Sequence, residues 1–296
     1  MSTRIVSIAP AFEDVMPKEY KELVENGPYG KDYKVTDLGK YKELIEEHPL
    51  CAGCGLALSL RLVLGSLPSP EDTVIVGSTG CSALVFPQVG LHNVHSLFGN
   101  QNAVASGIKR ALSLRFPDQV KDVVVVAGDG ATADIGLDMV MQSWFRREKI
   151  ATIMLDNEAY ANTGGQESGM SMEGTVMNMA PKGKVFPKAD LPKVAEAAGC
   201  AYVAAASPSR PGKLGKVVRR AILIAREVGP TYVQLLSPCP TNFKTKPSDT
   251  VVTIKAREKE KRFKQYEYIS DDARSFLSAL EDGKRSEGKQ PEGKQS

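Results

Sequence analysis

The sequence predicts an α/β protein built on a doubly wound, mostly parallel β-sheet. Segments with the apolar, β-branched composition of strands alternate with segments of helical periodicity. The strand segments are apolar throughout, without the polar alternation of a half-exposed sheet. Such strands are typical of a parallel sheet that helices cover on both faces. Ligands of these folds bind at the carboxyl ends of the strands.

The predicted elements follow one another as strand, turn and helix. The first helix is predicted from leucines and a valine at helical spacing over 55–67. Short apolar runs, mostly bounded by Gly, Asp or Pro, predict strands over 73–76, 122–127, 150–155, 201–204 and 231–236. Intervening segments predict helices over 102–116, 134–147, 191–198 and 211–228. Together they predict one domain over residues 46–245.

Two flanking segments differ in composition. Residues 1–45 are polar, with scattered Pro, Gly and Tyr, and are expected to form an N-terminal arm with one short helix near 37–47. Residues 246–296 are expected to form a charged C-terminal extension, with little core material over 255–296. Within it, a charge-rich helix is expected over 255–264 and disorder from Lys284 onward. Both flanks are candidate docking elements for a partner.

Composition excludes several classes of protein. Of the 296 residues, 42% are hydrophobic and 25% charged, which is ordinary for a soluble globular chain. The formal net charge is only +3, so nucleic acid is not an expected partner. No apolar run reaches the roughly 18 residues of a membrane helix, and no secretory signal is apparent. We therefore expect a cytoplasmic protein that does not associate with a membrane.

Polar residues gather where two of the predicted strands end. One strand is followed by Gly128-Asp129-Gly130 and the next by Asp156-Asn157. One βα unit separates these turns, so both should emerge at the same edge of the sheet. Mg²⁺ prefers oxygen ligands, few from protein and several from phosphates or water. Asp129, Asn157 and a carbonyl near Ala159 are candidate ligands, although Gly-Asp-Gly by itself is equally typical of a simple turn.

Four of the five cysteines lie in turns rich in Gly or Pro. Cys51 and Cys54 form a C-x-x-C pair before the first helix, and Cys81 and Cys239 each follow a predicted strand. An odd number of cysteines with one tight pair is unlike a secreted disulfide framework. Four such thiolates fit a [4Fe–4S] cluster, with a four-cysteine zinc site as the alternative. Cys200 is predicted to be a buried structural residue.

These two sets of residues together resemble a known family. A Gly-Asp-Gly turn followed one βα unit later by Asn is the thiamine diphosphate binding motif. Residues 157–166, Asn-Glu-Ala-Tyr-Ala-Asn-Thr-Gly-Gly-Gln, look like the matching segment of pyruvate:ferredoxin oxidoreductase and its 2-oxoacid relatives. The four cysteines match that family's cluster ligands. Over most of residues 46–245 the chain resembles the thiamine-diphosphate-binding β subunit of 2-oxoacid:ferredoxin oxidoreductases, with the corresponding fold.

The resemblance also implies roles for individual residues. It assigns Mg²⁺ to Asp129, Asn157 and the Ala159 carbonyl. It assigns the [4Fe–4S] cluster to Cys51, Cys54, Cys81 and Cys239. Asn162 is implied to face the thiazolium and the substrate carboxylate, and Thr163 is implied as a second catalytic residue. The full set implied to bind cofactor is Gly80, Cys81, Ser82, Gly128, Asp129, Gly130, Asn157, Ala159, Tyr160, Asn162, Thr163 and Gly164.

The implied function is oxidative decarboxylation of a 2-oxoacid. Electrons would pass singly to the cluster and on to ferredoxin, and in many relatives coenzyme A takes the acyl group. No glutamate in the chain can be assigned to the aminopyrimidine N1′ of thiamine diphosphate. In the family that residue comes from another subunit, so other subunits of α, γ and δ type, carrying this Glu and further clusters, are expected partners.

Some alternatives stay open at this point. One is a non-redox thiamine diphosphate decarboxylase subunit with structural cysteines, and another is a zinc-bearing scaffold. The acidic Glu167 departs from the family pattern and argues against plain pyruvate unless it points away from the site. A pyruvate-like acid or oxalate is the expected substrate, and aromatic, branched-chain or otherwise unusual 2-oxoacids also stay open. His92, His95 and Asn102 are further candidates for contact with substrate or cofactor.

Overall fold

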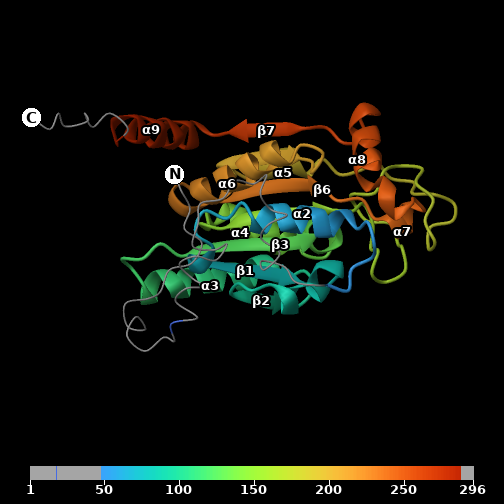
Figure 1. Ribbon diagram of the computed structural model, residues 1–296, viewed down its shortest axis with the longest axis horizontal. Helices are drawn as coiled ribbons and strands as arrows, with labels where there is room; N and C mark the ends of the chain where they lie inside the picture. The colour runs from blue at the N-terminus through green and yellow to red at the C-terminus, as the bar shows by residue number, and fades with distance from the viewer. Residues whose placement is uncertain (1–17, 19–47, 288–296) are drawn as a thin grey trace, which may run out of the picture.

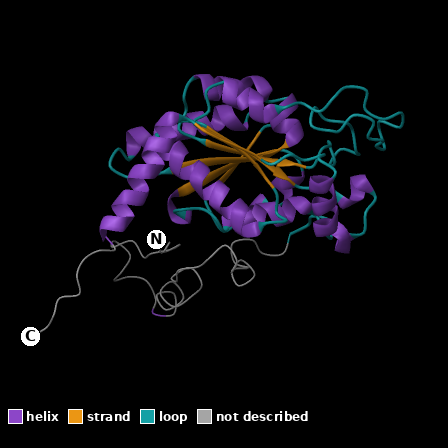
Figure 2. Cartoon of the chain, turned by 90° about the horizontal axis from the view of Figure 1, so that it is seen from above, coloured by secondary structure: helices purple, strands orange, loops and turns teal. Residues whose placement is uncertain are grey.

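The computed structural model describes residues 48–287 and Lys18, with side chains to residue 280. Apart from Lys18, the predicted N-terminal arm over 1–45 and its helix near 37–47 lie outside the described residues. Within them, seven strands form one sheet in the order β2-β1-β3-β4-β6-β5-β7. Helices cover both faces of this sheet (Figures 1 and 2). Neighbouring strands are parallel except for the antiparallel pair of β5 and β7, which confirms the predicted fold class.

The elements and their bounds are as follows. The strands are β1 (Thr73–Ser78), β2 (Asn93–Ser96), β3 (Asp122–Gly128), β4 (Ala151–Asp156), β5 (Tyr202–Ala206), β6 (Thr231–Leu236) and β7 (Tyr266–Ile269). The α-helices are α2 (Gly55–Leu64), α3 (Gln101–Arg115), α4 (Leu137–Phe145), α5 (Leu191–Ala197), α6 (Pro211–Glu227), α7 (Pro240–Phe243), α8 (Thr250–Lys259) and α9 (Asp271–Glu287). Short helical turns are η5 (Pro70–Asp72), η6 (Cys81–Leu84), η7 (Phe86–Gln88), η8 (Gly130–Asp134) and η9 (Pro247–Asp249).

The five predicted strands and the predicted helices of the domain are present, with bounds shifted by a few residues. The predicted helix over 134–147 is shorter, because a π-helical turn, η8, precedes α4. Two strands were not predicted. β2, Asn-Val-His-Ser, is a short polar edge strand beside β1. β7 comes from the charged C-terminal segment and joins the opposite edge.

The C-terminal segment corrects three expectations. The helix expected over 255–264 begins and ends about five residues earlier, as α8, because Lys261 takes a left-handed backbone conformation. Residues 284–287 belong to α9, so the disorder expected from Lys284 is wrong for them. Ile254 and Phe263 are buried in a small core with Leu236. Phe263 therefore adds a buried side chain from the segment over 255–296, in which little core material was expected.

Both faces of the sheet are packed, which explains the unbroken apolar strands. In β3, Val124 and Val126 join the core shared with α2 and α6, whereas Val123 and Val125 face the core that includes residues of α3. An apolar side chain on either face of such a strand is buried, and its burial stabilises the fold. None of the helices in the described residues has both the length and the apolar character needed to cross a membrane.

Candidate functional site

Strand register places the motif-bearing turns next to one another. β3 lies between β1 and β4, with Gly128 paired to Leu155 and Gly77 paired to Val126. β4 in turn pairs with β6 up to Asp156 and Leu236. All four strands run in the same direction, so the segments that follow them meet at one edge. Residues 79–82, 129–130, 157–163 and 237–239 therefore share the carboxyl edge of the sheet.

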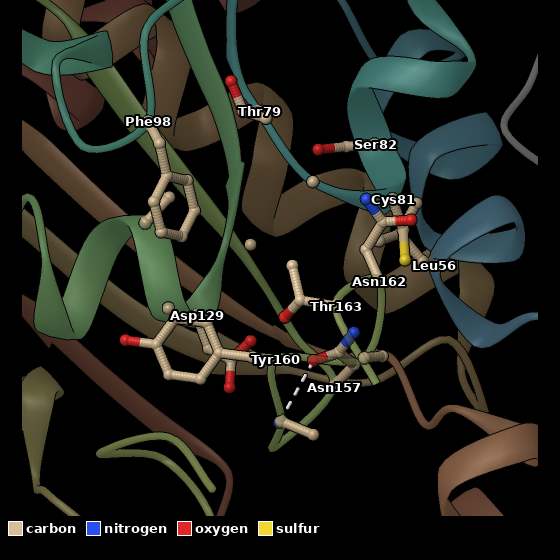
Figure 3. A pocket seen from close by; sticks show the side chains of 16 residues that line it. Leu56, Thr79, Cys81, Ser82, Phe98, Asp129, Asn157, Tyr160, Asn162 and Thr163 are labelled. Carbon is tan, nitrogen blue, oxygen red and sulfur yellow. Dashed lines mark hydrogen bonds between the residues drawn. The ribbon is translucent and has the colours of Figure 1, made fainter. Parts of the chain in front are cut away.

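A cavity opens at this edge between the ends of β1, β3 and β4, and we call it the aspartate cavity. It is lined by Leu56, Thr79, Gly80, Cys81, Ser82, Phe98, Gly128, Asp129, Gly130, Ala131, Asn157, Ala159, Tyr160, Ala161, Asn162 and Thr163. Figure 3 shows Phe98 and Cys81 on opposite sides of it, with Asp129 and Asn157 near one end. Of the twelve residues implied to bind cofactor, all but Gly164 line this cavity.

The carboxylate of Asp129 is buried without a cationic partner. Its side chain accepts a hydrogen bond of 2.6 Å from the Ser168 hydroxyl. Among the described residues, no Lys or Arg forms an ion pair with it. Burial raises the pKa of Asp129 well above its ordinary range and the nearby Asp156 raises it further, while the Ser168 hydrogen bond opposes the shift. A bound cation would reverse this balance and favour the ionised carboxylate.

Glycines shape the backbone around the Asp129 carboxylate. A Cβ atom added at Gly80 or Gly128 would meet no atom within 4 Å, so both backbones border open space. Gly80 also has a φ of 139°, a conformation that other residues rarely adopt. At Gly130 the added Cβ would lie 2.5 Å from the Tyr160 ring. Only glycine at this position lets that ring pack against the strand end, edge-on to Phe98 at 6.2 Å between centroids.

The segment after β4 forms a tight loop at the cavity mouth. Asn157 accepts a hydrogen bond from the Ala159 N–H at 3.2 Å (Figure 3). The Tyr160 N–H donates to the Gln166 carbonyl, and the Gly165 N–H donates to the Tyr160 carbonyl. Within this loop Asn162 and Thr163 are exposed and border the cavity. The Thr163 hydroxyl donates to the Gln166 side chain at 2.8 Å.

The four motif cysteines surround a second cavity next to the first, the cysteine cavity. It is lined by Pro49, Leu50, Cys51, Cys54, Leu56, Cys81, Leu84, Asn157, Ala161, Asn162, Ser237, Cys239, Pro240 and Thr241. The two cavities share a wall made of Leu56, Cys81, Asn157, Ala161 and Asn162.

Contacts between distant segments hold the cysteine turns together. The Gly55 N–H, at the start of α2, donates to the Pro238 carbonyl at 3.1 Å. The Thr241 hydroxyl donates to the Cys51 sulfur at 3.6 Å. The Asn242 N–H donates to the Cys239 sulfur at 3.4 Å. The first two bonds join the C-x-x-C turn to the segment that follows β6, and the third orders that segment around Cys239.

The thiols are electrostatically coupled to one another. Burial raises the pKa of Cys81 to about 11, and Cys54, Cys239, Cys51 and Asp129 add to this shift. Burial also raises the pKa values of Cys54 and Cys239. As free groups the thiols of Cys54, Cys81 and Cys239 stay protonated at neutral pH, whereas bound iron would favour their thiolates. In the part of the chain that the structure describes, no three His, Cys, Asp or Glu residues are grouped to hold a single metal ion.

Other candidates from the sequence lie elsewhere. His92 is exposed and outside both cavities. His95 is hydrogen-bonded at 3.0 Å to Thr79, which lines the aspartate cavity. Asn102 lies in the first turn of α3, where it is buried and donates to Ser143 and Thr152, and it lines neither cavity. Glu167 is exposed and does not line the cavity.

Sequence reasoning missed several lining residues. Leu56, Thr79, Phe98, Ala131 and Ala161 belong to the aspartate cavity. Thr79 and Ala161 each adjoin a predicted site residue, so their proximity in the chain was a usable signal. Leu56 and Phe98 carry no polar group and lie in other elements, so only tertiary packing reveals them. Cys200 is buried in the core as predicted.

Comparisons with known proteins agree with this geometry. The family described as "Thiamine pyrophosphate enzyme, C-terminal TPP binding domain" matches residues 78–235. Pyruvate synthase subunit PorB of Methanothermobacter marburgensis is 40% identical over 215 residues, covering 69% of this chain and 72% of the relative. 2-Oxoglutarate synthase subunit KorB of Methanocaldococcus jannaschii is 32% identical over 217 residues, covering 70% and 77%.

A solved structure is similar as well. It is a 2-oxoglutarate:ferredoxin oxidoreductase from Magnetococcus marinus with 2-oxoglutarate, coenzyme A and succinyl-CoA bound. The TM-score is 0.59 at 25% sequence identity, and the match covers 71% of this chain and 69% of that one.

Proposed function

The chain belongs to the family of 2-oxoacid:ferredoxin oxidoreductase β subunits with a thiamine pyrophosphate binding domain, and on this premise we propose that it is the catalytic subunit for oxidative decarboxylation of a 2-oxoacid. It is one subunit of a multi-subunit enzyme. In this proposal, electrons leave the substrate singly, pass to a [4Fe–4S] cluster in the cysteine cavity and continue to ferredoxin. When bound, thiamine diphosphate supplies the nucleophilic carbon and accepts the electrons released with CO₂.

The proposal gives each cavity one cofactor. Asp129, Asn157 and the Ala159 carbonyl would hold Mg²⁺ and, through it, the diphosphate. The fit is supported by a buried carboxylate without a cation and by glycine backbones at Gly80 and Gly128 that border open space. Asn162 and Thr163, exposed at the mouth, would orient the substrate carboxylate.

Cys51, Cys54, Cys81 and Cys239 would ligate the cluster. Zinc needs its four sulfurs about 2.3 Å from a single ion, whereas a cluster spreads its ligands over several irons. Thiols distributed around a cavity wall favour the cluster.

One observation carries the proposal, and it is the shared wall of the two cavities. Cys81 and Asn162 border both. A cofactor in the aspartate cavity would thus be a neighbour of an iron centre in the cysteine cavity, as single-electron removal requires. A non-redox decarboxylase has no use for this arrangement, because it returns a proton to its intermediate.

The substrate is proposed to be a pyruvate-like 2-oxoacid or oxalate, with coenzyme A as acyl acceptor for the former. Relatives are named for pyruvate, 2-oxoglutarate and ketoisovalerate. Because Glu167 is exposed outside the cavity, it does not oppose a substrate carboxylate. Expected partners are subunits of α, γ and δ type that carry the N1′-contacting Glu and further clusters, and ferredoxin.

The test is anaerobic purification of the assembled complex. We expect iron and thiamine diphosphate to co-purify and a brown colour that dithionite bleaches. We also expect methyl viologen reduction with one 2-oxoacid of a panel of pyruvate, 2-oxoglutarate, ketoisovalerate and oxalate, with and without coenzyme A. Colourless protein that decarboxylates without reducing the dye would establish the non-redox alternative instead.

A further inference from the structure

The charged C-terminal segment reaches the Mg²⁺ turn through one arginine. Arg257 lies on α8, beyond the residues that match the family. Its guanidinium is buried and forms a 2.5 Å ion pair with the Glu158 carboxylate. Glu158 lies between Asn157 and Ala159, the two proposed Mg²⁺ ligands that follow β4. Among the described residues of the C-terminal extension, Arg257 of α8 is the one that forms an ion pair with this turn.

The backbone of Glu158 is strained, and its polar groups are all engaged. Its φ of 60° is in the left-handed region, which is unfavourable for a residue with a side chain. Its carboxylate also accepts from Lys188 at 2.9 Å, and its carbonyl accepts from the Ser171 hydroxyl at 2.5 Å. Its N–H donates to Asp156. Such a conformation persists only where the surroundings hold it.

The conformation at Glu158 decides where its neighbours point. Rotation about its backbone would redirect both the Asn157 amide and the Ala159 carbonyl. Lys188 contributes a second clamp, because it also pairs with Asp156 at 2.7 Å. Arg257 is held in turn by the Phe243 ring of α7, with its guanidinium carbon 4.0 Å from the ring centroid. α7 begins directly after Cys239, so the arginine contacts segments of both cavities.

The other end of α8 contacts the C-x-x-C turn. Thr250, the first residue of the helix, donates its hydroxyl to the Gly53 carbonyl. A Cβ added at Gly53 would lie 2.2 Å from the Pro247 carbonyl oxygen, so the turn packs directly against the segment before α8. Figure 1 shows α8 beside α7 at one end of the sheet. A single helix thus contacts the turn between Cys51 and Cys54 and the turn that follows β4.

We propose that α8 is a brace that positions both sites, with Arg257 holding the Asn157–Ala159 turn and Thr250 holding the Cys51–Cys54 turn. The inference rests on the proposed function, since it assigns those turns to Mg²⁺–diphosphate and to the cluster. Arg257 and Thr250 are positioning residues, because neither lines the aspartate cavity or the cysteine cavity. The segment after β6 is then needed to keep the two cofactors in fixed relation.

A crossed pair of variants in the assembled complex tests this brace. R257Q is compared with K255Q, which removes the same charge from an exposed position of the same helix. T250V is compared with S248A, which alters a nearby exposed hydroxyl. Each is measured for thiamine diphosphate affinity with Mg²⁺ by calorimetry, for iron retained against a chelator, and for hydrogen exchange of peptides covering 156–160.

We expect R257Q to weaken thiamine diphosphate binding about 10–100-fold, as loss of outer-shell partners of a metal site does. Exchange over 156–160 should be faster, with iron retention unchanged. T250V should lose iron faster with unchanged thiamine diphosphate affinity, and K255Q and S248A should match the wild type. R257K keeps the charge but not the planar guanidinium, so its thiamine diphosphate affinity should lie between those of the wild type and R257Q. This variant provides the test if R257Q does not assemble.

Several outcomes would overturn the brace. If R257Q and K255Q bind thiamine diphosphate with equal affinity, Arg257 has no positioning role. If R257Q does not assemble, equal affinity of R257K and the wild type leads to the same conclusion. If either variant loses both thiamine diphosphate affinity and iron retention, the effect is general destabilisation rather than positioning. Equal iron retention in T250V and S248A would remove the role of Thr250. If the wild-type complex itself binds no thiamine diphosphate, the proposed function fails, and the inference fails with it.

Discussion

The aspartate cavity and the cysteine cavity share a wall but are assembled differently. Most of the first is made by residues that directly follow β1, β3 and β4, which are neighbours in the sheet. The second collects a turn before the sheet, the turns after β1 and β6, and part of the loop after β4. Strand register therefore places most of the first cavity, whereas the second also needs the C-x-x-C turn, which follows no strand and is held by contacts with the segment after β6.

This difference has consequences for mutation. A change in the aspartate cavity should act through one side chain and leave the cysteine turns in place. A change in a cysteine turn should release iron and leave strand register intact, because the sheet does not depend on that turn. The variants below test this separation, from the largest expected effect to the smallest.

Asp129→Ala should have the largest effect, and this effect should be confined to the aspartate cavity. It removes the buried carboxylate proposed as the protein's anionic Mg²⁺ ligand. Because even outer-shell partners of metal ligands contribute about 10–100-fold, we expect thiamine diphosphate affinity to fall by more than about 100-fold. Calorimetry on the complex measures this, and the iron content should stay at the wild-type level. Loss of iron together with the diphosphate would contradict independent cavities.

Cys239→Ser should produce the converse result. The thiolate is one of four proposed cluster ligands, and its sulfur also accepts the Asn242 N–H at the start of α7. We expect loss of iron and of the dithionite-sensitive absorbance, with thiamine diphosphate affinity unchanged. Iron analysis and visible spectra provide the readout. A variant that keeps the full iron content would show that Cys239 is not a ligand.

Gly130→Ala should have a smaller effect confined to the aspartate cavity. The new Cβ would lie 2.5 Å from the Tyr160 ring and force it to move. Overpacking of this kind costs about 1–3 kcal/mol, so we expect roughly tenfold weaker thiamine diphosphate binding. Gly128→Ala is a matched comparison, because it adds the same methyl group without displacing Tyr160. Its Cβ would enter open space and fill part of the proposed cofactor site. Wild-type affinity in Gly130→Ala would show that the position of the Tyr160 ring is unimportant.

Cys200→Ala should affect neither cavity. This thiol is buried beside Tyr232 in a core away from both sites. We expect a loss of about 1 kcal/mol in the free energy of unfolding, typical of a modest core truncation. Wild-type iron content and thiamine diphosphate affinity should be retained. Reduced iron would assign Cys200 a role that its burial argues against.

The sequence by itself determined the fold class and the family, and it predicted which residues form the two sites. Apolar strands and helical spacing between them predicted a parallel sheet, because a sheet covered on both faces needs apolar side chains on both. Gly128-Asp129-Gly130 and Asn157 were identifiable as a pair, because turns that follow two strands one βα unit apart lie at the same edge of the sheet. The four cysteines were recognisable as a set from one C-x-x-C pair, two cysteines that each follow a strand, and the resemblance to the family. β2 was missed because it is a short, polar edge strand, and β7 because it has only four residues within a charge-rich segment.

Only the tertiary structure decided how these parts meet. No local pattern places Cys51 and Cys54 beside Cys239, since that contact depends on α2 packing against the segment after β6. Nor does any pattern pair Arg257 with Glu158, because ion pairs between distant segments leave no periodic signal in a sequence. Local residue preferences fix turns and strands, whereas contacts across the chain arise only when the whole core packs.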